Sequence, residues 1–189
     1  MLSASRGNHC GGIDQVTRKR IFALSLAAAV LVLVATASVA WADPTSSHSG
    51  GANANQIGVV RIDPNNPMAA YVTGRYTCPA GADAHLFVSV KQVESGLPDR
   101  RLKEEGSSQY TSAWLETHPT PDAWTCDGTW HIGTWRITDD PTDPSYMPWD
   151  YGFGGPLIPG QVYVQFCWDD NTGNNAWHAY SEQYARAAY

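Results

Sequence analysis

Hydrophobic and polar positions alternate along most of the chain after residue 56. The clearest alternation lies in His85–Val93, where Leu86, Val88 and Val90 share one side of an extended backbone. A repeat of two residues predicts a β-strand with one buried side, and clusters of turn residues separate this segment from similar ones. The pattern predicts seven strands, at Ile57–Asp63, Ala69–Cys78, His85–Val93, Ser108–Glu116, Thr129–Ile137, Gln161–Asp169 and Ala176–Tyr184.

The connections between these runs indicate the fold class. Residues 94–107 are charged and contain Gly and Pro, which predicts a loop with at most one helical turn. Residues 170–175, DNTGNN, predict a hairpin connection between the last two strands. No segment shows a convincing helical repeat of apolar residues. We therefore expect an all-β fold, an antiparallel immunoglobulin-like β-sandwich of about seven strands.

A different pattern occupies residues 1–42. Basic residues up to Arg20 precede an unbroken apolar run over residues 21–35, and Ala40 and Ala42 then form an A-x-A site. This order is typical of a secretory signal peptide and predicts cleavage after Ala42. An uncleaved signal anchor is the alternative, because the apolar run is almost long enough to span a bilayer. The basic flank keeps the N-terminal end inside in both cases, so we expect the remaining chain to be exported.

Charge then narrows the class of partner. Without residues 1–42 the chain has 8 basic and 17 acidic residues, a net charge of −9. So acidic a chain is a poor ligand for nucleic acid or anionic membranes, and we expect a secreted, soluble monomer with neither partner. Residues 43–55, DPTSSHSGGANAN, are small and polar without an apolar repeat, which predicts a flexible linker. Residues 56–189 are then the single β-sandwich domain.

Three cysteines follow the predicted cleavage site: Cys78, Cys126 and Cys167. An exported chain can keep disulfides, and three cysteines allow three single pairings with one residue left over. Cys78 and Cys126 both lie beside turns, where strand ends can approach to bonding distance, so we favour this pair. Cys167 lies inside a predicted strand, where we expect a partly buried thiol, and the other two pairings stay open.

Tryptophan is unusually frequent, since seven of the eight residues follow residue 42. Exposed tryptophans can stack on sugar rings or anchor a protein partner, whereas a β-sandwich also buries large aromatic residues in its core. Strand alternation divides the two groups. Trp168 falls on the same side as Val164, and Trp130 falls on the same side as Ile132. We therefore expect Trp130 and Trp168 in the core.

Five residues are candidates for ligand binding. His131 and Trp135 share the side of their strand opposite to Trp130, where a binding role stays open. Residues 138–160 form a long loop rich in Pro, Gly and Asp, and loops of this length are usually functional or disordered. Its aromatic residues favour function over disorder. The candidates in this loop are Tyr146, Trp149 and Tyr151.

Candidate catalytic and metal-binding patterns are weak. The acids of Asp139–Asp143 are best interpreted as a solvated loop. Asp169–Gly173 lacks the downstream Glu of a calcium loop and matches the residues that a hairpin turn requires. The histidines form no HExxH motif, and the chain contains no GxSxG, P-loop or nucleotide-binding fingerprint. We therefore predict no catalytic residue, no metal and no cofactor.

Five segments carry short motifs: Gly74–Cys78 (GRYTC), Leu86–Gln92 (LFVSVKQ), Cys126–His131 (CDGTWH), Pro159–Gln165 (PGQVYVQ) and His178–Gln183 (HAYSEQ). Together they resemble the motifs of small secreted actinobacterial Ig-like β-sandwich proteins of unknown function. The resemblance implies that Cys78 and Cys126 form a disulfide, and it implies no activity. Cys167 and the long aromatic loop depart from the family pattern.

These observations lead to one main functional hypothesis and two alternatives. The main hypothesis is a secreted, non-enzymatic β-sandwich that binds an extracellular protein or glycan. The first alternative is a carbohydrate-binding module, which would need exposed Trp and Tyr side chains in line. The remote alternative is a hydrolase with an Asp/His pair, which would need His131 or His178 to meet an aspartate and Cys167 in a pocket.

Overall fold

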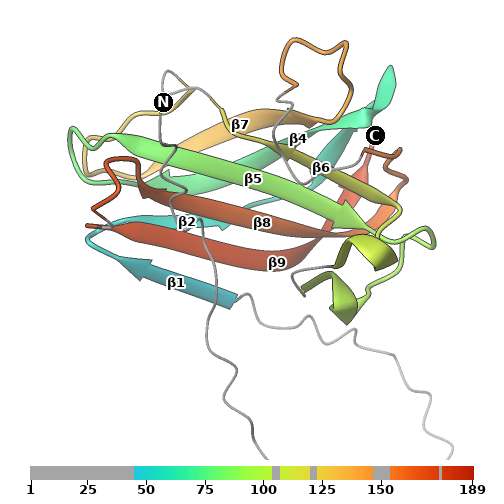
Figure 1. Cartoon of the computed structure of the whole chain (residues 1–189), viewed down its shortest axis with the longest axis horizontal. Coiled ribbons are helices and arrows are strands. Elements are labelled where there is room, and N and C mark those ends of the chain that lie inside the picture. The colour runs from blue at the N-terminus through green and yellow to red at the C-terminus, as the bar shows by residue number, and fades with distance from the viewer. Residues whose placement is uncertain (1–44, 104–106, 120–122, 147–153, 175) are drawn as a thin grey trace, which may run out of the picture. The chain divides into compact units, whose positions relative to one another are not determined.

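A computed structural model of the chain describes residues 45–103, 107–119, 123–146, 154–174 and 176–189 (Figure 1). These residues contain two short 3₁₀-helices, η1 (Arg100–Lys103) and η2 (Ser107–Tyr110), and nine strands. In this part of the chain, no helix has the length and apolar character needed to cross a bilayer. The strands are β1 (Thr45–Ser49), β2 (Asn53–Gln56), β3 (Val60–Asp63), β4 (Asn66–Thr77), β5 (Ala84–Gln92), β6 (Ala113–Thr117), β7 (His131–Thr138), β8 (Gly160–Asp170) and β9 (His178–Ala188).

The strands form one mixed sheet that is not closed. Its main order is β2-β4-β3-β9-β8-β5-β6, with β1 added beside β9 and β7 beside β4. Figure 1 shows β5, β8, β9 and β1 side by side, and β4 next to β7. All pairs are antiparallel except β3 with β9. The expected all-β fold is confirmed, but the expectation of purely antiparallel pairing is wrong at this one pair.

The core lies between the inner side of β4 and β7 and the inner side of β5 and β8. Trp135 of β7 reaches across this space, and its ring centroid lies 5.6 Å from that of Phe166 on β8. The ring needs a gap in the backbone surface, which two glycines paired across β4 and β7 provide. A Cβ atom at Gly74 would lie 2.9 Å from the Phe166 ring, and one at Gly133 would lie 2.5 Å from the Trp135 ring.

This packing decides which tryptophans are buried. Trp168 is fully buried, as expected. Trp130 and Ile132 are 45% and 69% exposed, whereas Trp135 is only 4% exposed, so the predicted orientation of this strand is wrong. The two sides of the strand were grouped correctly, but the side predicted to face the core faces outward instead. The physical reason is that Trp135 shares its side with buried Ile137 and with a glycine that makes room for the indole.

The predicted flexible linker is also wrong over its described residues. β1 pairs with β9 and β2 pairs with β4, so strand structure begins at Thr45 instead of near residue 56. Ala52 and Ala54 are 1% and 2% exposed, and both belong to the core cluster. A small polar segment gains order here because its backbone completes the hydrogen bonds of two long strands. These two early strands also raise the number of strands above the expected seven.

The favoured disulfide is confirmed. The sulfur atoms of Cys78 and Cys126 lie 2.06 Å apart, and the bond joins the end of β4 to the segment before β7. Cys167 is 3% exposed, so it is buried within β8. The bond between Cys78 and Cys126 therefore holds the turn that precedes β7 against the β4 end.

Candidate functional site

The five predicted binding residues lie in different environments. Trp135 is inside the core, so its predicted role as an exposed binding residue is wrong. Tyr146 is half-buried at the start of the long loop. Trp149 and Tyr151 lie outside the described residues. His131 is partly exposed beside the disulfide, where it forms an ion pair with Asp127.

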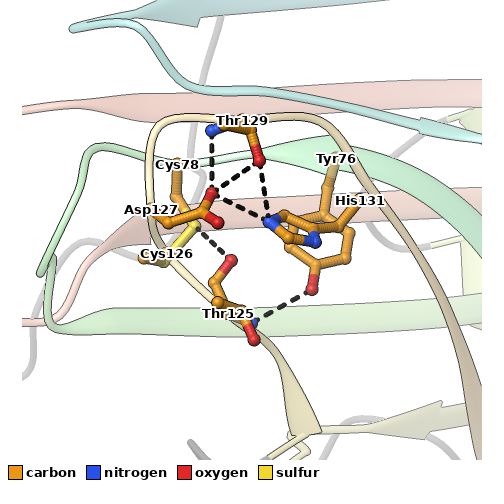
Figure 2. Close-up of a disulfide and its surroundings, with 7 residues drawn as sticks. All are labelled: Tyr76, Cys78, Thr125, Cys126, Asp127, Thr129 and His131. Atoms are coloured by element: carbon orange, nitrogen blue, oxygen red, sulfur yellow. Dashed lines mark hydrogen bonds and ion pairs between the residues drawn. A yellow bond between two sulfur atoms is a disulfide. The ribbon is translucent and has the colours of Figure 1, made fainter.

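His131 belongs to a hydrogen-bonded turn beside the disulfide (Figure 2). Its Nε2 atom lies 2.9 Å from Oδ1 of Asp127 and 3.2 Å from Oγ1 of Thr129. The backbone N–H of Thr129 donates to the same carboxylate oxygen at 2.8 Å. These bonds, the one with His131 first, lower the pKa of Asp127 to about 2, so the carboxylate stays ionised at neutral pH. The imidazole also stacks on Tyr76, with 5.5 Å between the ring centroids.

This turn has the residue types of a catalytic relay but not its geometry. In a relay of hydroxyl, imidazole and carboxylate, one ring nitrogen faces the hydroxyl and the other faces the carboxylate. Here the same nitrogen of His131 faces both Thr129 and Asp127. The bonds therefore close a turn, and they do not favour the Asp/His hydrolase. His178, the other histidine named for that alternative, contacts the hydroxyls of Ser47 and Ser49 instead.

A second histidine cluster joins β5, β8 and the segment after β6, and the sequence analysis did not single it out. Nε2 of His85 lies 2.7 Å from Nδ1 of His118, and Nδ1 of His85 lies 3.3 Å from Oδ1 of Asp169. Strand register explains one of these contacts, because β5 and β8 place His85 opposite Asp169. Within the described residues, no group of three or more His, Cys, Asp or Glu side chains can hold a metal ion.

The outer side of β4 carries a row of polar and cationic groups. Tyr71 and Thr73 alternate along β4 with buried residues. The register of β7 places Arg136 beside Tyr71 and Thr134 beside Thr73. On the other edge of β4, the register of β3 places Arg61 beside Tyr71. Sheet pairing therefore brings together side chains that are up to 75 positions apart in the sequence.

Tyr71 lies between two guanidinium groups. The Cζ atoms of Arg61 and Arg136 are 4.9 and 5.2 Å from the centroid of its ring. Nη1 of Arg136 donates to Asp63 at 2.6 Å, and its Nε and Nη2 atoms donate to Asp143 at 2.9 and 2.6 Å. The bond with Asp143 raises the pKa of Arg136, and the same bond lowers the pKa of Asp143. Arg136 is thus neutralised, and it ties the start of the long loop to the sheet.

Beside this row lies a groove with a volume of about 540 Å³. It forms where β3, β4 and β7 meet the C-terminal end of β9. Its volume falls within the range of small-molecule sites, about 300–1,000 Å³. The residues that line it are Val59, Arg61, Tyr71, Thr73, Thr134, Arg186, Ala188 and Tyr189.

Three arginines on this side of the sheet have no carboxylate partner in the described residues, whereas Arg136 is paired with Asp63 and Asp143. Arg75 lies over the exposed Trp130, with its Cζ atom 4.3 Å from the ring centroid. Across the described ranges, no carboxylate forms an ion pair with Arg61, Arg75 or Arg186. The contrast with the formal net charge of −6 for the whole chain is clear. We refer to these outward-facing residues as the arginine face: Arg61, Tyr71, Arg75, Trp130, Arg136 and Arg186.

Comparisons with known proteins provide no independent assignment. No protein-family profile, curated protein or solved structure matches this chain. The resemblance of its short motifs to exported actinobacterial β-sandwich proteins therefore stays a hypothesis based on those motifs alone. The functional assignment has to come from the geometry of the chain itself.

Part of the arginine face was visible in the sequence. The alternation of Ala69–Cys78 groups Tyr71, Thr73 and Arg75 on one side of a predicted strand, but it does not single that side out as a binding surface. The missing information was the register. Nothing in the local pattern places Arg61 next to this strand, or brings Arg186 from the last strand to the same groove.

Proposed function

We propose that this chain is an exported, non-enzymatic β-sandwich protein of immunoglobulin type that binds a ligand through the arginine face and its groove. One observation carries the assignment to this surface. Arg61 and Arg186 line a groove of suitable volume without a carboxylate partner in the described part of the chain. The signal-peptide pattern of residues 1–42 supports export, and the cysteine pair supports an oxidising compartment.

The immunoglobulin-type assignment is supported by the core. Inner sides of strands pack around Trp135 and Trp168, as the two sheets of such sandwiches do. The disulfide departs from that pattern, because the immunoglobulin bond spans two sheets. Here Cys78 and Cys126 link β4 to the segment leading into its direct neighbour β7. The disulfide therefore gives no support to the immunoglobulin-type assignment, which depends on the core packing.

A carbohydrate-binding module remains the second candidate, and one observation favours it. Tyr71, Trp130 and Tyr189 lie on or beside the arginine face, and the last two are 45% and 63% exposed. A platform of several exposed tryptophans is not supported, since Trp135, Trp168 and Trp177 are buried among the described residues. A sugar ligand would therefore depend on tyrosine, arginine and threonine side chains more than on tryptophan.

Binding of the purified chain to a glycan array and to cell-surface material tests the proposal. We expect a double Arg61→Ala, Arg186→Ala variant to lose binding, because both arginines line the groove. The matched control is Arg100→Ala, an exposed arginine on η1 outside the groove. A Trp149→Ala variant tests the long loop separately. Binding that survives the double substitution but disappears with Trp149→Ala would move the site to the loop and refute the proposal.

A further inference from the structure

We propose that the groove on the arginine face binds an acidic carbohydrate, with a carboxylate or sulfate group of the sugar on Arg61 and Arg186. This inference rests on the proposed function, because it names the ligand class of the same surface. Four observations lead to it: the orientation of Arg61, the hydroxyl groups beside it, the pairing of the strands below it, and the charge of the remaining chain.

Arg61 is oriented for an anion but has none in the described residues. Its guanidinium lies over the Tyr71 ring, with 4.9 Å between Cζ and the ring centroid. A guanidinium held over an aromatic ring by a cation–π contact uses none of its N–H donors for that contact. Stacking therefore limits the rotation of the group without using its donors. A planar carboxylate matches such donors in a two-bond pair, and a sulfate matches them through two of its oxygens.

Hydroxyl groups line the floor of the same groove. Oγ1 of Thr73 and Oγ1 of Thr134 lie 2.9 Å apart, so one hydroxyl donates to the other. The accepting hydroxyl keeps its own hydrogen for another acceptor. The Tyr71 hydroxyl accepts a hydrogen bond from Arg136 at 2.9 Å, which likewise leaves its hydrogen available. Sugar hydroxyls are matching partners, because each can both donate and accept.

The strand pairing excludes β4 as the place where an acidic peptide could add as a further strand. β4 is paired on one edge with β7 and on the other with β2 and β3. Its backbone groups are therefore used, and a peptide cannot add to it as a further strand. A ligand over β3 and β4 therefore meets side chains, and the exposed rings of Trp130 and Tyr189 lie on the same surface. Aromatic rings of this kind provide flat apolar contact area for the C–H faces of a sugar.

The charge of the whole chain limits the ligand further. Without residues 1–42 the formal net charge is −9, so a long polyanion such as nucleic acid is repelled outside the arginine face. A short acidic oligosaccharide carries only a few charges, so it can place them near the arginines while little of it extends over the remaining surface. Attraction at an open groove is screened by ions, so we expect affinity to fall as salt is raised.

Calorimetric titration of the purified chain tests this inference with four probes. They are a galacturonate hexamer, its methyl ester, a hexasaccharide whose only charged groups are sulfates, and hexaglutamate. We expect the galacturonate hexamer to bind and its ester to bind at least about tenfold more weakly, because esterification removes the charge-assisted bonds. Tighter binding of the sulfated sugar would identify sulfate as the natural group. Binding of hexaglutamate but of neither acidic sugar would overturn the inference.

Variants separate this inference from the proposed function. Arg61→Gln and Arg186→Gln should each weaken acidic-sugar binding by about tenfold, while Arg100→Gln leaves it unchanged. Equal thermal midpoints would show that the variants are folded. If the ester binds as tightly as the acid and the groove variants still weaken both, the acidic-sugar inference fails and the groove remains the binding site. If the groove variants change no binding at all, the proposed function fails as well.

Discussion

Alanine in place of Gly133 tests the orientation of β7, on which the position of the arginine face depends. A Cβ atom at this position would lie 2.5 Å from Cζ2 and 2.8 Å from Cη2 of Trp135. These distances are too short for carbon atoms, and the indole is 4% exposed in the core, so it has little room to move. Gly133→Ala should therefore destabilise the fold, although alanine normally suits a strand better than glycine does.

Two opposing effects determine the size of the loss. Overpacking of a core typically costs about 1–3 kcal/mol. Replacement of a glycine in a strand interior raises the free energy of unfolding by about 0.5–1 kcal/mol, because the unfolded chain loses conformational freedom. We expect Gly133→Ala to lower the free energy of unfolding by about 1–2 kcal/mol. In a Trp135→Leu background the clash disappears, so the same substitution should be neutral or stabilising by about 0.5–1 kcal/mol.

Urea unfolding followed by far-UV circular dichroism measures all four free energies of this cycle, because the signal does not depend on Trp135. Ile132→Ala is the control from the opposite side of β7, where the side chain is 69% exposed, and it should change stability by less than about 0.5 kcal/mol. If Gly133→Ala stabilises the chain in the presence of Trp135, the indole does not cover Gly133. Trp130 and Ile132 would then regain their expected inward orientation.

Three further predictions concern other parts of the fold. Cys126→Ala should lower the free energy of unfolding by about 4 kcal/mol, since it opens a loop of 48 residues, and urea unfolding of oxidised and reduced protein measures this loss. Arg136 lowers the pKa of Asp143, so the contribution of this carboxylate to the free energy of unfolding is complete above the unfolded pKa of 3.8. The contribution is lost as the pH falls through the lower pKa of the folded chain. Asp143→Asn should therefore reduce the loss of stability on acidification, which urea unfolding at a series of acidic pH values measures. Ala54→Asp should destabilise by more than about 2 kcal/mol because residue 54 is buried, whereas Ser46→Asp, at an exposed position, should have little effect on thermal unfolding.

The strands with strong alternation were the most predictable part of the fold. The run around Val88 was expected from residues 85 to 93 and is observed as β5 from residues 84 to 92. Such runs carry the information locally, because a period of two residues needs no partner to be recognised. β1 and β2 carry no such signal. Alanines such as Ala54 contribute little apolar contrast, and only pairing with β9 and β4 reveals that this segment is ordered.

The orientation of β7 shows a different limit. Alternation correctly grouped Trp135 with His131 and Trp130 with Ile132, but it did not indicate which group faces inward. Both groups contain a tryptophan, so apolar content alone cannot decide between them. The decision depends on Gly74, which the sequence places 59 positions before Gly133 and the sheet places directly opposite it. Only this pair of glycines creates the space that Trp135 fills.

The sequence by itself determined that the chain is rich in strands, and it favoured the cysteine pair that the structure contains, because both depend on residues close to one another or on turns beside them. The tertiary structure decided the inward side of β7, the order of residues 45–56, and the meeting of Arg61, Tyr71 and Arg186 at one groove. The physical reason is that strand register and packing depend on contacts between distant segments. A local pattern records the two sides of each strand, but not the strand that lies beside it.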